Sequence, residues 1–249
     1  LQAQTKGPLP DNFVFIGAGF LPTVKIPFGG SQIDLISIIV AIIATVAIIL
    51  AELKSVKTKK KYGFALVPTW QLIVKNGVLL FIVWFFLYKL ACWNGLPFVL
   101  LLMAILVAIY AFITSNTVAG RQIYALGGNR KAAQLSGIDT NKVFFWVYVN
   151  MGVLSALAGI VLAARNASAT PKAGDGFEMD AIASCYIGGA AVAGGAGTIM
   201  GAVVGAFVMG ILNNGMSLCG LTTDIQKIVK GAVLLGAVTV DVLSKRKKG

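Results

Sequence analysis

The sequence predicts an all-α fold: a polytopic transmembrane helical bundle with about seven crossings in this chain and one broken or re-entrant segment. Of the 249 residues, 57% are hydrophobic and only 12% are charged, whereas soluble domains carry roughly 25% charged residues. Apolar runs long enough to cross a bilayer alternate with polar loops. Lys and Arg gather in a few of these loops, as they do on the cytoplasmic side of membrane proteins.

The first half of the chain is predicted to hold three crossings behind an N-terminal loop. Residues 1–34 are rich in Gly and Pro and contain no apolar run that could span a bilayer, so we expect an extracytoplasmic loop. The transmembrane domain then covers 35–249. A lysine-rich loop at 54–61 follows the first crossing, and a tight turn at 92–97 precedes the third. These three crossings are predicted at 35–53, 70–91 and 98–117.

The second half begins with a polar connector, residues 120–142, which carries a short helical pattern of its own. Further on, a polar loop at 166–177 precedes a glycine-rich apolar segment, 178–198. Its glycines leave open whether this segment crosses the membrane or re-enters it. Gly201 and Gly205 form a GxxxG pair, which favours close packing of helices. The remaining crossings are predicted at 143–165, 199–218 and 224–243.

The positive-inside rule orients these helices. If the loop at 54–61 is cytoplasmic, alternation places 120–142 inside and 166–177 outside. The basic C-terminus is also cytoplasmic only if 178–198 crosses, which gives seven crossings with the N-terminus outside. The basic residues of the three inside segments are Lys54, Lys57, Lys59, Lys60, Lys61, Arg121, Arg130, Lys131, Lys142, Lys245, Arg246, Lys247 and Lys248.

Several residue types that catalysis or ion coupling would need are missing. The chain has no His, which is the commonest general base and metal ligand, and no GxxxxGK[ST] phosphate loop. Its three Cys lack metal-site spacing. No series of acidic residues lies in the crossings, which argues against a proton- or sodium-coupled pump. We expect no catalytic residue, metal, cofactor or nucleic-acid partner for this chain.

The connector contains KAAQLSG at residues 131–137. A short helix with small residues on one face can seat in a cleft of a partner subunit, and Gly137 lets the chain turn away closely. The alternative is an ordinary basic loop. This spacing resembles the EAA loop of bacterial ABC importer permeases, with Lys131 where that loop often has Glu.

Longer stretches in the same order resemble the sugar permeases of the ribose/xylose/galactose ABC importer family, nearest to its xylose or multiple-sugar branch. The resemblance runs from Gly120 to about Lys245. The family's N-terminal spans have no counterpart here, so we expect the chain to begin partway through a longer protein. The matching stretches are GRQIYALGGNRKAAQLSGID, YVNMGVLSALAGIVLAAR, FEMDAIASCYIGGA, GTIMGAVVGA and GILNNGMS.

The resemblance implies a permease subunit in the bacterial inner membrane that passes a monosaccharide, xylose or a related sugar. A separate ATPase subunit would bind ATP inside, a sugar-binding protein would dock outside, and a second permease copy would complete a dimer. The sugar itself is left open, as is the role of Lys131, whose charge is opposite to that of Glu. The residues expected to contact the ATPase are Gly128, Asn129, Arg130, Lys131, Ala132, Ala133, Ser136 and Gly137.

Intramembrane amides are candidates for the substrate path. Asn150, Asn213 and Asn214 interrupt apolar crossings, and amides offer both donors and acceptors to sugar hydroxyls. The alternative is hydrogen bonding between helices. Asp241 is expected to pair with a nearby Lys or Arg.

Asp175, Glu178 and Asp180 form an acidic cluster on the predicted outer side. These carboxylates could meet the binding protein, or they could line a solvated loop and a helix N-terminus, where acids are favoured. The competing function is a secondary transporter or channel for a small polar solute. Such a protein would need a coupling-ion site in the membrane and no docking helix.

Overall fold

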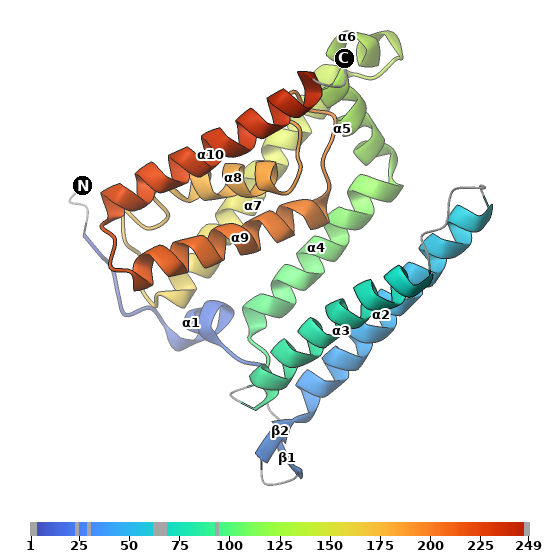
Figure 1. The fold of residues 1–249 in the computed structure, drawn as a ribbon. Helices are drawn as coiled ribbons and strands as arrows, with labels where there is room; N and C mark the ends of the chain where they lie inside the picture. Colours follow the sequence, from blue (N-terminus) through green and yellow to red (C-terminus); the bar gives the residue numbers. More distant parts are fainter. Residues whose placement is uncertain (1–3, 23–24, 29–30, 62–68, 93–94, 247–249) are drawn as a thin grey trace. The chain divides into compact units, whose positions relative to one another are not determined.

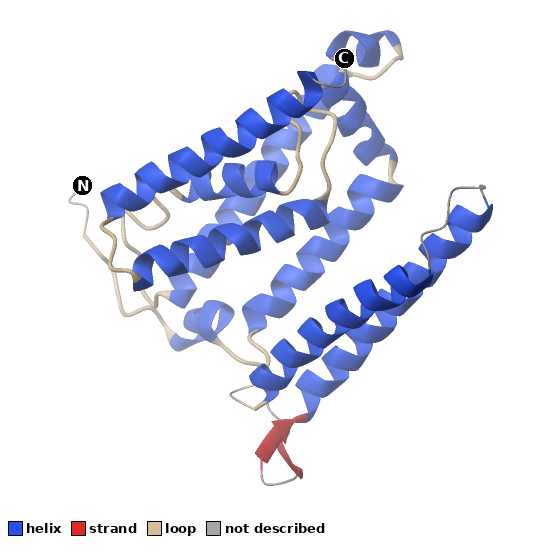
Figure 2. Ribbon diagram, in the orientation of Figure 1, coloured by secondary structure: helices blue, strands red, loops and turns tan. Residues whose placement is uncertain are grey.

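The computed structural model describes residues 4–22, 25–28, 31–61, 69–92 and 95–246. The chain forms two compact units, an N-terminal unit of Pro10–Leu101 and a C-terminal unit of Leu1–Leu9 with Leu102–Gly249. Helices make up most of both units (Figure 1 and Figure 2). The predicted helical fold is therefore confirmed in its general class.

The N-terminal unit contains two long helices that pack against each other, α2 (Leu35–Lys61) and α3 (Thr69–Ala91). The indole nitrogen of Trp84 on α3 donates a hydrogen bond to the Thr45 hydroxyl on α2, at 3.0 Å. Asp34 begins α2, because its carboxylate accepts bonds from the backbone nitrogen and the hydroxyl of Ser37, at 3.0 and 2.7 Å. Such a side-chain acceptor satisfies an amide that has no partner within the helix.

Two features of this unit differ from the predictions. Residues 1–34 were expected to form a loop, but they contain a helix and an antiparallel hairpin whose register pairs Lys25 with Asp34 and Phe28 with Ser31. The lysine-rich segment 54–61 is also not a loop, because α2 continues to Lys61. Lys is a good helix former and is favoured near a helix C-terminus, and no Gly or Pro interrupts the run. The added elements are α1 (Asp11–Ala18), β1 (Lys25–Phe28) and β2 (Ser31–Asp34).

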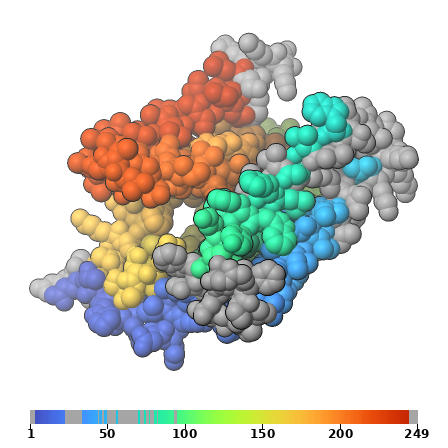
Figure 3. Space-filling model, turned by 60° about the horizontal axis from the view of Figure 1, so that its bottom comes forward, coloured from blue at the N-terminus to red at the C-terminus, as the bar shows by residue number. Residues whose placement is uncertain are grey.

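The C-terminal unit follows the predicted order of apolar segments closely. Its short helix α8 lies between α9 and α10 and contacts both (Figure 1), and the three belong to the orange-to-red block of Figure 3. The segment 188–198 after α8 has no regular secondary structure. The helices are α4 (Phe98–Asn116), whose first turn lies in the N-terminal unit, α5 (Val118–Gly128), α6 (Arg130–Leu135), α7 (Thr140–Arg165), α8 (Phe177–Ile187), α9 (Ile199–Leu218) and α10 (Thr223–Arg246).

Three helices in the described part of the chain are long and apolar enough to cross a membrane: α4, α7 and α9. Large apolar side chains on them are exposed in the isolated chain, for example Phe112 at 62% and Phe207 at 65%. Such surfaces fit contact with lipid or with other helices. The number of seven crossings stays a prediction.

Glycines bring α8 and α9 into backbone contact. The GxxxG pair of Gly201 and Gly205, which lies on α9, predicted such close packing. A Cβ atom at Gly205 would lie 2.8 Å from the carbonyl carbon of Ser184 and 3.0 Å from the nitrogen of Gly188. A Cβ atom at Gly188 would lie 2.6 Å from the nitrogen of Ala202. Only residues without a side chain permit such an approach.

We predict that Gly205→Ala lowers the stability of the protein by about 1–3 kcal/mol, because the added methyl group forces α8 away from α9. The matched control is Gly210→Ala on the same helix, where a Cβ atom meets nothing within 4 Å. This control should be neutral or stabilising by up to about 1 kcal/mol through helix propensity. Thermal unfolding in detergent measures both variants. Equal unfolding temperatures for the two variants would contradict the proposed contact.

Candidate functional site

The polar connector folds into the end of α5, the whole of α6 and the start of α7. Asn129 ends α5 and begins α6: its backbone nitrogen donates to the Ala125 carbonyl, and its side-chain oxygen accepts from the Ala132 nitrogen at 3.0 Å. Asn is among the preferred helix N-cap residues for this reason. One side chain thus holds the corner between two helices.

The other end of α6 is closed by a glycine turn. Gly137 has φ +84°, and Ile138 donates a backbone hydrogen bond to Ala133 at 3.1 Å, so the chain leaves α6 through a left-handed residue. A Cβ atom at Gly137 would meet nothing within 4 Å, which makes its role conformational. Asp139 then caps α7, and the backbone N–H of Lys142, followed by its side chain, holds the pKa of this carboxyl below its usual range.

Two residues attach α6 to its surroundings. The Arg130 guanidinium donates to the Asn141 side-chain oxygen at 3.1 Å and lies 5.0 Å from the centroid of the Phe144 ring. Ala133 is buried, with 4% of its surface exposed. Arg130 and Ala133 therefore hold α6 in place, while Lys131, Ala132 and Ser136 are exposed.

Leu135 at the end of α6 was not among the predicted site residues. Its side chain is 90% exposed, more than any other large apolar side chain in the described part of the chain. The signal in the sequence was a single large apolar residue inside the polar stretch KAAQLSG. An exposed leucine on a well-anchored helix is a suitable anchor for a partner surface.

The three predicted amides face different surroundings. Asn150 on α7 accepts a 2.5 Å hydrogen bond from the Tyr110 hydroxyl on α4, and both line a cavity of about 680 Å³. Asn214 lines a separate cavity of about 300 Å³ beside Met103. Asn213 points instead toward α8. The described structure does not bring these three amides into one site.

Asn213 belongs to a partly buried polar cluster with Asp180 and Lys230. One carboxylate oxygen of Asp180 accepts from the Asn213 amide and from the Lys230 ammonium, both at 2.9 Å. The side chains of Lys230 and Asp180 are only 13% and 17% exposed. The cluster joins α8 to α9 and α10. Sequence reasoning missed Lys230, which lies within an apolar run 50 residues from its partner.

The predicted acidic cluster is divided by the fold. Asp175 forms an exposed ion pair with Lys227 at 3.0 Å, and the hydrogen bond and charge of that lysine lower the pKa of Asp175. Glu178 in the first turn of α8 is exposed as well. Asp180 is the member that points between the helices, toward Asn213 on α9 and Lys230 on α10.

The segment 188–198 connects α10 with the end of α5. The backbone nitrogen of Val192 donates to the Asp241 carboxylate at 3.1 Å. The expected pairing of Asp241 with a Lys or Arg stays a prediction. At the α5 side, the Tyr124 hydroxyl donates to the Gly197 carbonyl at 2.8 Å. Asp241 and Tyr124 thus both contact this segment.

Comparison with known proteins places the chain among membrane transport components. The family model described as "Branched-chain amino acid transport system / permease component" matches residues 15–238. The xylose transport system permease protein XylH of Haemophilus influenzae is 35% identical over 243 residues, which cover 98% of this chain and 62% of the relative. XylH of Escherichia coli is 45% identical over 155 residues, covering 62% of this chain and 39% of the relative.

The ribose import permease protein RbsC of Escherichia coli is 47% identical over 147 residues, covering 59% of this chain and 46% of the relative. In each of these comparisons the matched region spans less than two thirds of the relative's length. No solved structure matches the chain significantly.

We predict that Asn129→Ala destabilises α6 by about 0.5–2 kcal/mol, because it removes the acceptor for the Ala132 amide. Hydrogen exchange of the amides of residues 130–136 should then be faster by about 2- to 30-fold. Asn129→Asp keeps the acceptor and should exchange like the parent protein. Unchanged exchange in Asn129→Ala would show that the cap does not hold this helix.

Proposed function

This chain belongs to the family of permease components of branched-chain amino acid transport systems, and from this membership we propose that it is the permease subunit of an ABC importer for a monosaccharide, xylose or a related sugar. The observation that carries the choice of sugar is the 35% identity to a xylose transport permease over 98% of this chain. The ribose permease supports the same class of solute. A family of transport components gives no ground for an enzymatic role.

The energy would come from a separate ATPase subunit that docks on residues 128–137. Three features of this segment support the assignment: α6 is capped at both ends, it is attached to α7 through Arg130, and it exposes Leu135. A short, well-anchored helix transmits force better than a flexible loop, because little of the motion is lost in rearrangement of the helix itself.

The orientation we propose has α5, α6 and the C-terminus in the cytoplasm. The end of α10 lies on the same side of the C-terminal unit as α6, and residues 4–9 lie on the other side (Figure 1). There Lys6 pairs with Ala169 through two backbone hydrogen bonds, at 2.9 and 2.8 Å. This arrangement fits an outer position for the N-terminal residues and for the loop 166–177.

We propose that α8 and the segment 188–198 together cross the membrane rather than re-enter it. Asp175, just before α8, pairs with Lys227 near the start of α10. The segment 188–198 reaches α5 through Tyr124, and α5 lies toward the opposite end of the unit (Figure 1). The chain therefore passes from one end of the bundle to the other between Asp175 and Gly197, as seven crossings require.

The outer partner in this proposal is a sugar-binding protein, and the exposed carboxylates of Asp175 and Glu178 would face it. Asp180 would act indirectly, by holding α8 in place through Lys230. A second copy of the permease would complete the pathway. Helices of that copy, or other segments, would have to line the pathway together with Asn150, Asn213 and Asn214 for these amides to face it. ATP would be bound by the ATPase alone.

Two other functions make different experimental predictions. One is import of branched-chain amino acids, which the family description names. The other is secondary transport, which would need no ATPase. The decisive experiment reconstitutes the full-length permease in vesicles with its ATPase and binding protein, and measures uptake of D-xylose, D-ribose and L-leucine. We expect ATP-dependent uptake of a pentose. Uptake of leucine alone, or sugar movement without the ATPase, would contradict the proposal.

We predict that Leu135→Ser weakens binding of the ATPase at least about tenfold, as expected for an interface anchor worth more than about 1.4 kcal/mol. Co-purification with the ATPase and ATP-dependent uptake should fall together. The matched control is Leu218→Ser, because Leu218 is 82% exposed but lies at the end of α9. If Leu135→Ser and Leu218→Ser retain equal ATPase binding, α6 is not the docking helix.

A further inference from the structure

The end of α5 and the segment 188–198 touch through their backbones. A Cβ atom at Gly127 would lie 2.6 Å from the nitrogen of Gly195, and one at Gly194 would lie 2.6 Å from the carbonyl oxygen of Gly127. A Cβ atom at Gly195 would lie 2.6 Å from the Cα atom of Gly128. No side chain stands between the two segments at these points, so neither can move toward the other by changing a rotamer.

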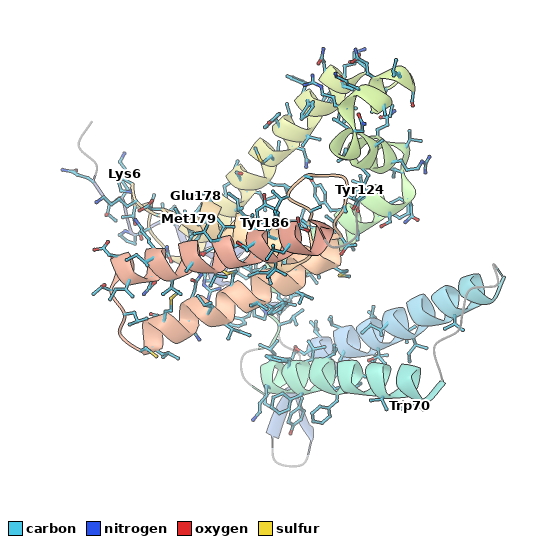
Figure 4. All side chains as sticks on the ribbon, turned by 45° about the horizontal axis from the view of Figure 1, so that its top comes forward. Lys6, Trp70, Tyr124, Glu178, Met179 and Tyr186 are labelled. Carbon is cyan, nitrogen blue, oxygen red and sulfur yellow. The ribbon has the colours of Figure 1, made fainter. Side chains whose placement is uncertain are left out.

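A hydrogen bond fixes the same contact in register. The Tyr124 hydroxyl, one turn before Gly127, donates to the carbonyl oxygen of Gly197 at 2.8 Å. Tyr124 lies beside the segment 188–198 in Figure 4. The backbone contact resists compression and the hydrogen bond resists separation, so the two segments are held together in both directions.

The segment 188–198 makes further contacts elsewhere in the unit. The Val192 nitrogen donates to the Asp241 carboxylate on α10 at 3.1 Å, and the Ala191 nitrogen donates to the Ala196 carbonyl at 2.9 Å. The segment begins at Gly188, whose backbone touches that of Gly201 on α9. A displacement of α5 therefore reaches α8, α9 and α10 through one compact piece of chain.

We propose that 188–198 is a coupling segment. It transmits displacement of the docking corner, the junction of α5 and α6 at Asn129, to the helices α8–α10. Tyr124, Gly127, Gly194 and Gly195 are its positioning residues, and none of them is required to touch the solute. This inference rests on the proposed function, since a docking corner transmits displacement only if an ATPase moves it. It assigns the mechanical role to a segment outside the predicted docking residues.

The test compares Gly127→Ala with Gly152→Ala in the complete complex with ATPase and binding protein. The methyl group at 127 has no room against Gly195, whereas a Cβ atom at Gly152 on α7 meets nothing within 4 Å. We expect Gly127→Ala to retain ATPase binding and ATP hydrolysis while the amount of D-xylose moved per ATP falls at least about fivefold, the lower range of coupling between two sites. Gly152→Ala should keep the parent ratio.

A second variant covers the case in which Gly127→Ala does not assemble. Tyr124→Phe removes only the hydroxyl that bonds Gly197, and Tyr148→Phe is its control because Tyr148 is exposed on α7. Hydrogen exchange of residues 189–198 should change on addition of a non-hydrolysable ATP analogue in the parent and in Tyr148→Phe. We expect this change to be lost or reduced in Tyr124→Phe.

The outcomes separate the coupling segment from the proposed function. An unaltered ratio of sugar to ATP in Gly127→Ala, or an unaltered nucleotide response in Tyr124→Phe, overturns the coupling role. If Gly127→Ala only loses folding, hydrolysis and uptake fall in proportion, and the nucleotide response of Tyr124→Phe then decides whether the coupling role stands. If the parent complex moves no sugar with ATP, the proposed function fails instead.

Discussion

The arrangement of the C-terminal unit depends on one constraint, the need to pair the backbone that follows a helix too short to cross a membrane. The 11 residues of α8 extend about 16 Å at 1.5 Å per residue, against a hydrocarbon core of about 30 Å. The chain then continues through 188–198 without helical hydrogen bonds. In the crossing that we propose, this irregular backbone lies at membrane depth, where only protein can satisfy it. The Tyr124 hydroxyl, the Asp241 carboxylate and an internal backbone bond provide that satisfaction.

The charged groups inside the helices serve the same need for defined packing. Asp180 and Lys230 would each be costly to bury alone, but together with Asn213 they connect three helices through a single carboxylate oxygen. The exposed pair of Asp175 and Lys227 is a weaker tie, since solvent screens such pairs. The two pairs hold the start of α10 beside α8 at two successive positions along its length.

The sequence was sufficient for the long apolar helices, and insufficient for α1, for the end of α2 and for the contacts between helices. Apolar runs of bilayer length located α4, α7 and α9, because burial in lipid constrains every turn of such helices. The lysine-rich end of α2 was mistaken for a loop, because charge was given more weight than the helix propensity of Lys. The partner of Asn213 could not be predicted from the sequence, because Asp180 lies 33 residues away on another helix. The turn at Gly137 was local and therefore predictable, whereas the exposure of Leu135 depends on which face α5 and α7 cover.

The polar cluster of α8–α10 also bears on the energetics of any movement of these helices. The second oxygen of Asp180 and the side-chain oxygen of Asn213 are buried and find no donor among the described residues. Acceptors in such a site need a donor from water, a solute or another helix, because a buried acceptor without one costs about 1–3 kcal/mol. The free energy of packing α8 against α9 and α10 therefore depends on which donor reaches these two oxygens.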